Sequence, residues 1–173
     1  MRKILLVIDM QNDFIDGALG TAEAVAMLPR AIEEIKKYPA ADIIATRDTH
    51  NPDYMDTQEG KNLPVPHCIR NTEGWELNDT VKAAVGSAEI IDKPTFGSKV
   101  LAEKLAAMAE KEELEITLIG LCTDICVVSN ALMIKAYLPE TRVNVIADCC
   151  AGVTPATHAA ALETMKMCQI NVI

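Results

Sequence analysis

A strand followed by a helix is the clearest pattern at residues 116–127, which read ITLIGLCTDICV. The first six residues form a short apolar run that is typical of a buried strand, and a run with helical periodicity follows from Ile125 to Leu138. Cys126 is therefore predicted in the first turn of a helix, at the carboxyl end of a parallel strand. Helix-dipole charge and free backbone N–H groups favour a thiolate there, and open α/β sheets place their chemistry at this edge. Cys126 is thus a candidate nucleophile.

The same alternation of short apolar runs with longer helical patterns continues along the chain, which predicts βα units around a parallel sheet. Most of the apolar runs are rich in β-branched residues, as expected of strands covered on both faces. The expected strands are Lys3–Ile8, Asp42–Thr46, Glu89–Ile91, Glu115–Leu121, Arg142–Ala147 and Gln169–Ile173. The other expected helices run from Thr21 to about Tyr38, Asn78 to Val85, Ser98 to about Glu113, and Thr154 to about Met167. We expect an α/β fold in three αβα layers, a doubly wound six-stranded parallel sheet with helices on both faces, in one domain spanning residues 1–173.

Composition and charge narrow the class of protein. The chain has 173 residues, half of them apolar, and a net charge of −9, which argues against nucleic acid and anionic membranes as partners. The six cysteines do not form the pattern of a disulfide framework in a chain this long. The apolar run at Ile4–Ile8 is too short for a signal-peptide core, and no run reaches the roughly 20 apolar residues of a membrane span. We therefore expect a cytoplasmic protein.

Two further charged residues close apolar runs and so should face the same sheet edge as Cys126. They are Asp9, after the first run, and Lys93, after the third. A carboxylate there could take the thiol proton, and an ammonium could stabilise the thiolate or a developing negative charge. The alternative interpretation is that Cys126 is a buried helix cysteine, that Asp9 caps a turn, and that Lys93 is solvated.

A second group of candidates lies in residues 48–77, a long stretch with no clear periodicity. Loops of this length in compact domains are usually functional. Asp48 and His50 stand two residues apart at a strand end, so both can point the same way, and Glu59 and His67 follow. Two histidines with carboxylates suit Zn²⁺, Mn²⁺ or Fe²⁺. The alternative is a hydrogen-bonded loop in which Asp48 caps a turn.

Three motifs, in this order along the chain, resemble the isochorismatase-like cysteine hydrolases, and within them the nicotinamidases. The motifs are DMQNDF at residues 9–14, the lysine at position 93, and GLCTDICV at residues 120–127. The resemblance implies that Asp9 is the catalytic base, Lys93 the catalytic lysine and Cys126 the attacking residue.

It further implies a cis peptide between Leu121 and Cys122, with the N–H groups of Cys122 and Cys126 forming an oxyanion hole.

The resemblance also bears on the metal and the substrate. It implies that Asp48, His50, Glu59 and His67 hold a divalent ion, with zinc preferred and manganese or iron as alternatives. Many nicotinamidases carry a Trp shortly before the last metal-ligand His, where this chain has Pro64-Val65-Pro66. The residues expected to line the substrate pocket here are Phe14, Trp75 and Leu121.

The implied activity is hydrolysis of nicotinamide, or alternatively of another small amide or carbamoyl compound. The family commonly forms dimers or tetramers, so we expect a homo-oligomer.

Two other functional classes fit parts of the pattern. A phospho-accepting receiver domain is also a small doubly wound domain with an acidic edge and a lysine. Such domains are shorter and require adjacent acidic residues after the first strand. A cysteine at the start of a helix has no role in them. A redox sensor would use Cys122 and Cys126, but these cysteines do not form a Cys-x-x-Cys motif.

Overall fold

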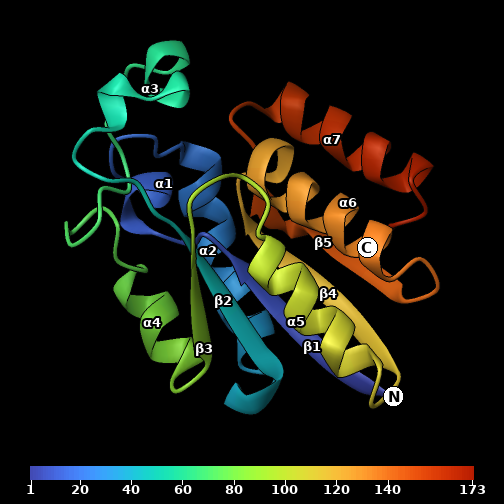
Figure 1. The fold of residues 1–173 in the computed structure, drawn as a ribbon. Helices are drawn as coiled ribbons and strands as arrows, with labels where there is room; N and C mark the ends of the chain where they lie inside the picture. Colours follow the sequence, from blue (N-terminus) through green and yellow to red (C-terminus); the bar gives the residue numbers. More distant parts are fainter.

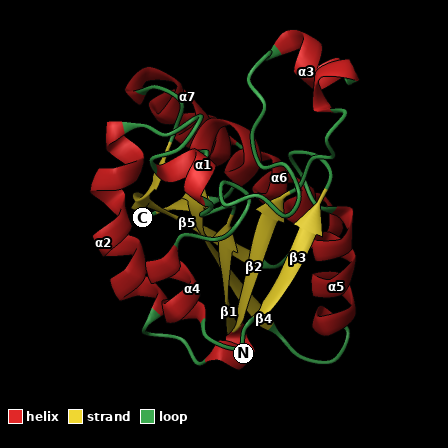
Figure 2. Ribbon diagram, turned by 90° about the vertical axis from the view of Figure 1, so that its left-hand side faces the viewer, coloured by secondary structure: helices red, strands yellow, loops and turns green.

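A computed structural model covering residues 1–173 has a six-stranded parallel sheet between two layers of helices (Figures 1 and 2). The sheet order is β3-β2-β1-β4-β5-β6, and every neighbouring pair is parallel. The strands are β1 (Arg2–Ile8), β2 (Ile43–Asp48), β3 (Glu89–Lys93), β4 (Leu114–Leu121), β5 (Arg142–Ala151) and β6 (Asn171–Val172). The expected α/β fold with six parallel strands is confirmed.

Helices cover both faces of the sheet, because buried strand residues alternate between two apolar layers. Leu5 and Val7 of β1 pack in the layer under α2 and α4, whereas Leu6 and Ile8 pack in the layer under α5 and α6. The helices are α1 (Asn12–Ile15), α2 (Ala22–Ile35), α3 (Gln58–Asn62), α4 (Asp79–Val85), α5 (Lys99–Ala109), α6 (Val128–Tyr137) and α7 (Pro155–Met167). None of them is long and apolar enough to cross a membrane.

The order of the strands reverses between β1 and β4, and parallel sheets bind ligands in the crevice at such a point. The backbones of the two strands approach closely there. A Cβ at Gly120 would lie 2.1 Å from the Ile8 carbonyl oxygen, and Gly120 has φ +121°. Only glycine fits this position, which lies two residues before Cys122 and just ahead of the turn that contains Cys126.

Several element boundaries differ from the sequence expectation. Strand β3 continues to Lys93 because its last residue pairs with Asp48 of β2. Strand β5 continues to Ala151 because a bulge in the register lets its pairing with β4 resume at Gly120. Helix α5 ends at Ala109, four residues before the expected Glu113.

Two regions expected to be simpler contain additional turns. The helix expected from Ile125 is divided into a wide π-helical turn, Thr123–Val127, followed by α6. The segment after β2, expected to be irregular, contains a 3₁₀ turn at Tyr54–Asp56 and the short helix α3. Helix α3 begins at the N-cap Thr57 and stands apart from the rest of the molecule at the upper left of Figure 1.

Candidate active site

Lys93 joins the polar residues at the carboxyl edge of the sheet. Its Nζ is 2.6 Å from Asp9 Oδ2 and 3.4 Å from Cys126 Sγ. The same nitrogen donates to the Thr95 carbonyl and lies 3.2 Å from Asp48 Oδ1. The three residues expected to do the chemistry are therefore in mutual contact through one buried ammonium group.

Asp9 is held rigidly beside Lys93. It has a positive φ of 44° directly after β1, a conformation that non-glycine residues adopt rarely. The Thr46 hydroxyl donates to Asp9 Oδ1 at 2.6 Å and accepts the Asp9 backbone N–H at 3.2 Å. Apart from its ion pair with Lys93, Oδ2 has no hydrogen-bond partner. Burial raises the pKa of Asp9, and the Lys93 charge opposes that rise, so this carboxylate is suited to accept a proton.

Cys126 lies in the π-helical turn, buried at 3 % exposure. Burial and then the negative charge of Asp9 raise the pKa of its thiol well above the ordinary value, while Lys93 opposes the rise. Burial thus opposes the helix-terminal effect from which a thiolate is expected at this position. A carboxylate that can remove a thiol proton, that of Asp9, lies in the same cluster and is joined to Cys126 through Lys93.

The turn also presents unused backbone donors. The peptide between Leu121 and Cys122 is cis, as the family resemblance implied. The Cys122 N–H donates to no protein acceptor. The N–H groups of Ile125 and Val127 donate to the Cys122 carbonyl, whereas the Cys126 N–H does not. A substrate oxygen near Cys126 could use such N–H groups.

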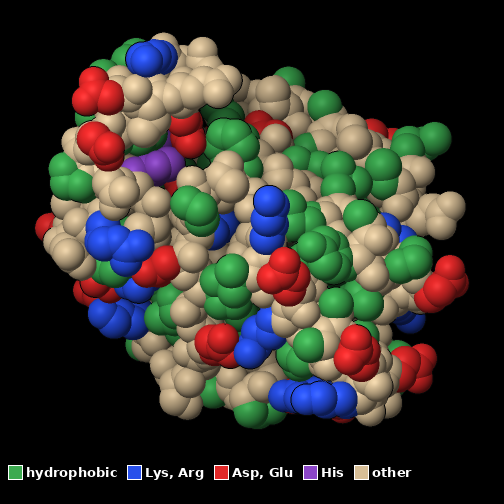
Figure 3. Space-filling model, in the orientation of Figure 1, with side chains coloured by type: hydrophobic (Ala, Val, Ile, Leu, Met, Phe, Trp, Pro, Cys, Tyr) green, Lys and Arg blue, Asp and Glu red, His purple; other side chains and the backbone are tan.

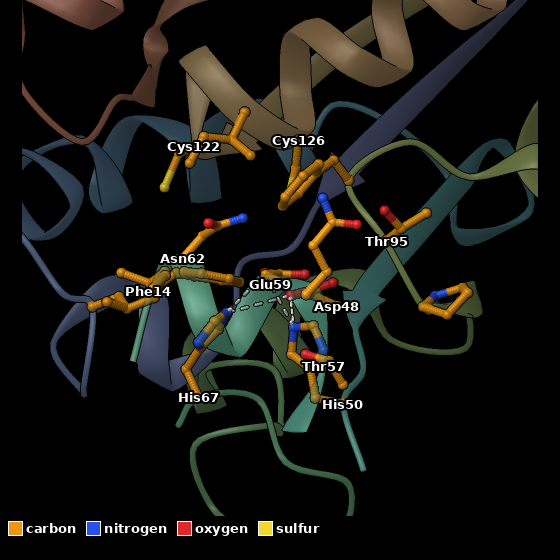
Figure 4. Close-up of a pocket in the computed structure, with 16 residues that line it drawn as sticks. Phe14, Asp48, His50, Thr57, Glu59, Asn62, His67, Thr95, Cys122 and Cys126 are labelled. Carbon is orange, nitrogen blue, oxygen red and sulfur yellow. Dashed lines mark hydrogen bonds and ion pairs between the residues drawn. The ribbon is translucent and has the colours of Figure 1, made fainter. Parts of the chain in front are cut away.

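A cavity of about 550 Å³ opens above these residues. Figure 3 shows it as a hollow beside the α3 region, with histidine side chains at its rim. In Figure 4, Cys122 and Cys126 lie on one side of the cavity, and His50, His67 and Glu59 face them from the other. It is lined by Phe14, Leu19, Asp48, His50, Thr57, Gln58, Glu59, Asn62, Leu63, His67, Pro94, Thr95, Phe96, Cys122, Ile125 and Cys126.

Of the three residues expected to line the substrate pocket, Phe14 borders this cavity, whereas Trp75 and Leu121 do not. The Trp75 indole N–H donates to Thr49 Oγ1 at 2.8 Å, and the Arg47 guanidinium lies 3.6 Å from the ring centroid. Both attachments hold the ring in the core behind the cavity. Leu121 is buried in the same apolar layer. The exposed Phe96, not selected from the sequence, supplies the second aromatic wall.

The four candidate metal ligands do come together. Asp48, His50, Glu59 and His67 each place one ligand atom within 4.8 Å of the others. Asp48 and His50 come from the end of β2, Glu59 from α3, and His67 from the segment that follows. His67 Nδ1 is engaged by the Val65 carbonyl at 2.8 Å, which leaves Nε2 facing the group.

This donor set fits a divalent transition-metal ion. Two imidazoles and two carboxylates form a four-ligand set that suits zinc, and the two carboxylate charges match those of a dication. The His50 and His67 rings are 4.9 Å apart and pack edge-on against Tyr54, which fixes their orientation.

Three residues that sequence reasoning did not select support these groups. Gln11 donates to the Asp48 carbonyl and accepts the Asp48 N–H. Buried Asn130 donates to the Cys126 carbonyl and accepts from the Ser98 N–H. Gln11 follows Asp9 within a quoted motif, and Asn130 is an amide inside an apolar helical run. Thr46, described above, is a hydroxyl in an apolar strand. Thr46 and Asn130 thus stand out as polar residues within apolar patterns, whereas Gln11 lies in a polar stretch and does not.

Comparisons with known proteins agree with this arrangement. A family model described as the isochorismatase domain matches residues 3–173. The chain belongs to the isochorismatase family. Its relatives include a nicotinamidase/pyrazinamidase of Mycobacterium tuberculosis, which is 26 % identical, with 99 % of this chain and 98 % of the relative covered. An Escherichia coli nicotinamidase is 29 % identical, with 95 % and 90 % covered.

Solved structures of family members also align over the full chain. The pyrazinamidase of Pyrococcus horikoshii, solved in complex with zinc, matches with a TM-score of 0.80 and 29 % identity, and covers 100 % of this chain and 99 % of its own. A nicotinamidase/pyrazinamidase of Bacillus subtilis matches with a TM-score of 0.80 and 26 % identity, and 99 % of each chain is covered.

Proposed function

We propose that this isochorismatase-family protein is a cysteine-dependent amidohydrolase that converts nicotinamide to nicotinate and ammonia. The observation that carries the proposal is the position of Lys93 Nζ, in contact with both Asp9 Oδ2 and Cys126 Sγ at the edge of the cavity. The relatives named as nicotinamidases support the choice of amide.

In the first half of the reaction, Asp9 removes the proton of the Cys126 thiol and the sulfur attacks the carboxamide carbon. The carbonyl electron pair moves to oxygen, and the N–H groups of Cys122 and Cys126 stabilise that charge. Asp9 then gives its proton to the amide nitrogen. The C–N bond breaks, ammonia leaves, and a thioester on Cys126 remains.

In the second half, Asp9 takes a proton from water, and the oxygen attacks the thioester carbon. The C–S bond breaks, the carboxylic acid leaves, and the proton held by Asp9 returns to the sulfur. Lys93 remains protonated throughout and keeps the carboxylate and the sulfur in register, since the charges around it raise its pKa against the effect of burial.

The divalent ion, for which we propose zinc, would be held by Asp48, His50, Glu59 and His67. When bound, it supplies a Lewis-acidic contact for the ring nitrogen of the substrate. Phe14 and Phe96 would flank the ring. Metal analysis of the purified protein identifies the ion.

The test is ammonia release from nicotinamide by wild-type protein and by Cys126→Ala. We expect turnover by the wild type and its loss in the variant with the fold intact, because the variant has no sulfur in contact with Lys93. Cys168→Ala, at an exposed cysteine, is the matched control and should retain full activity. Amidase activity retained by Cys126→Ala would remove this residue from the nucleophile role.

A second candidate is hydrolysis of another small amide or carbamoyl compound. Pro64-Val65-Pro66 replaces the tryptophan found in many nicotinamidases, and Trp75 is not in the cavity. A screen of small amides beside nicotinamide separates the two candidates.

We also propose that the protein is a cytoplasmic homo-oligomer. Light scattering of the purified protein would test its assembly, and cell fractionation would test its location.

A further inference from the structure

Residues 122–127, here called the nucleophile turn, are held by the segment that leads from β5 into the first turn of α7. Thr123 is fully buried, and its hydroxyl lies 2.8 Å from His158 Nδ1, its only polar partner. Next to it, the Asp124 carboxylate accepts the Val153 N–H at 3.1 Å. Two successive side chains of the turn are thus attached to one neighbouring segment.

The position of His158 is itself well supported. Helix α7 begins with a capping box formed by Thr154 and Thr157, and the His158 N–H donates to the Thr154 carbonyl. A Cβ at Gly152 would lie 2.9 Å from the Cβ of His158. A glycine at this position therefore lets the end of β5 pass close to the histidine.

We propose that His158 is a positioning residue for the reaction: through Thr123 it fixes the nucleophile turn so that the N–H groups of Cys122 and Cys126 point at the developing oxyanion. The inference rests on the proposed amidase function. Thr123 directly follows Cys122, so its side chain restrains the peptide plane next to one of the two donors. The hydrogen bond with His158 sets the orientation of the Thr123 side chain.

Loss of the bond leaves the Thr123 hydroxyl buried and unpaired, and the turn can shift to relieve it. Such a shift misplaces the oxyanion donors, whose contribution is largest in the transition state. The walls of the cavity around the substrate ring come mainly from other segments, among them Phe14, Asn62 and Phe96. The loss should therefore reduce kcat and leave KM nearly unchanged.

The experiment compares nicotinamide hydrolysis by the metal-loaded wild-type protein with hydrolysis by variants at His158 and Thr123. His158→Ala and Thr123→Val should each lower kcat about 5- to 50-fold with KM within about twofold, less than the loss of a whole oxyanion donor. His158→Asn should recover most of the rate, because its amide atoms branch from Cγ as Nδ1 does. The double variant His158→Ala/Thr123→Val should be no slower than either single variant, since both remove the same bond.

Thr164→Val is the matched control on the same helix. Its exposed hydroxyl bonds only to the Ala160 carbonyl, so kcat should not change. A second measurement uses pyridine-3-carbaldehyde, to whose carbonyl carbon the Cys126 sulfur adds while Asp9 takes the thiol proton. The resulting oxyanion needs the same donors. The inhibition constant of the aldehyde should therefore rise in the His158→Ala and Thr123→Val variants in parallel with their loss of kcat/KM.

The outcomes are separable. A wild-type kcat in His158→Ala, with only a lower unfolding temperature, would overturn the inference and leave the amidase proposal standing. An unchanged aldehyde inhibition constant beside a lower kcat would also contradict it. Absence of amide hydrolysis by the wild-type protein would remove the proposed function, and this inference with it.

Discussion

Lys93 is a cation in an almost fully buried position, and the two carboxylates around it compensate its charge. Its side chain is inaccessible to solvent, and the side chains of its ion-pair partners Asp9 and Asp48 are 0 % and 3 % exposed. Burial alone would lower its pKa, but the negative charges of Asp9 and Asp48 raise it. Burying a charge is tolerable only with such partners, so each partner depends on the others.

Replacing Lys93 by Met tests this dependence. We expect the free energy of unfolding to fall by about 3–5 kcal/mol, because two carboxylates are left buried without their cation. Amide hydrolysis should be lost as well. Urea denaturation measures the stability change. Lys104→Met is the control, since its ion pair with Glu89 is exposed and should contribute less than about 1 kcal/mol. Equal losses in the two variants would contradict this view of the buried cluster.

The buried thiol of Cys150 should make the protein less stable at alkaline pH. Burial raises the pKa of Cys150 to about 12, from an ordinary value of 9.0. The contribution of the neutral thiol is fully present below pH 9 and is lost as the pH rises toward 12, since the unfolded chain releases its proton first.

Urea denaturation between pH 9 and pH 12 checks this expectation. Cys150→Ala should be less stable at neutral pH, yet its stability should fall less steeply with pH than that of the wild type. The difference in slope should be about 1.4 kcal/mol per pH unit for one proton. Parallel slopes for the two proteins would show that this thiol does not titrate on unfolding.

At the scale of elements, the nucleophile turn depends on how closely β4 passes β1. Gly120→Ala places a methyl group against the Ile8 carbonyl and demands an unfavourable φ, so we expect at least about 2–3 kcal/mol of destabilisation. Gly86→Ala is the matched control, because Gly86 also has a positive φ but open space around it, and should cost about 1–2 kcal/mol from backbone strain alone. Urea denaturation of both variants gives the comparison; a cost at Gly120 no larger than at Gly86 would remove the role of close approach.

The strands and most helices were predictable because their apolar patterns are local properties of the sequence. Asp9, Lys93 and Cys126 were selected because each follows an apolar run, and parallel strands end at one edge. The positions of Trp75 and His158 could not be predicted in this way. Contacts with Thr49 and Arg47 hold the Trp75 ring outside the cavity. His158 contacts Thr123, which lies far from it in the sequence. Both positions therefore depend on packing between segments that are distant along the chain.

Across the whole molecule, the candidate metal site connects the α3 region to the sheet. Glu59 is its only member from α3, and the other three come from the end of β2 and from position 67. A bound ion therefore joins α3 to the end of β2 and to position 67. Because the unfolded chain does not hold these ligands together, metal binding should raise the thermal stability.

Chelation of the purified protein should lower its unfolding temperature, and added zinc should restore it. Glu59→Gln should weaken metal binding at least about tenfold and reduce this shift. Glu73→Gln, at an exposed acid of the same loop, is the control and should behave as wild type. Calorimetry with and without zinc makes the measurement; a full zinc shift in Glu59→Gln would remove this residue from the ligand set.

The order of strands has a consequence for synthesis of the protein. Strand β4 pairs with β1, although two complete βα units separate them along the chain. Before the ribosome has produced residue 126, Asp9 and Lys93 exist without the Cys126 sulfur. The nascent polypeptide therefore carries no activated cysteine, and its reactivity arises only when late residues reach the centre of the sheet.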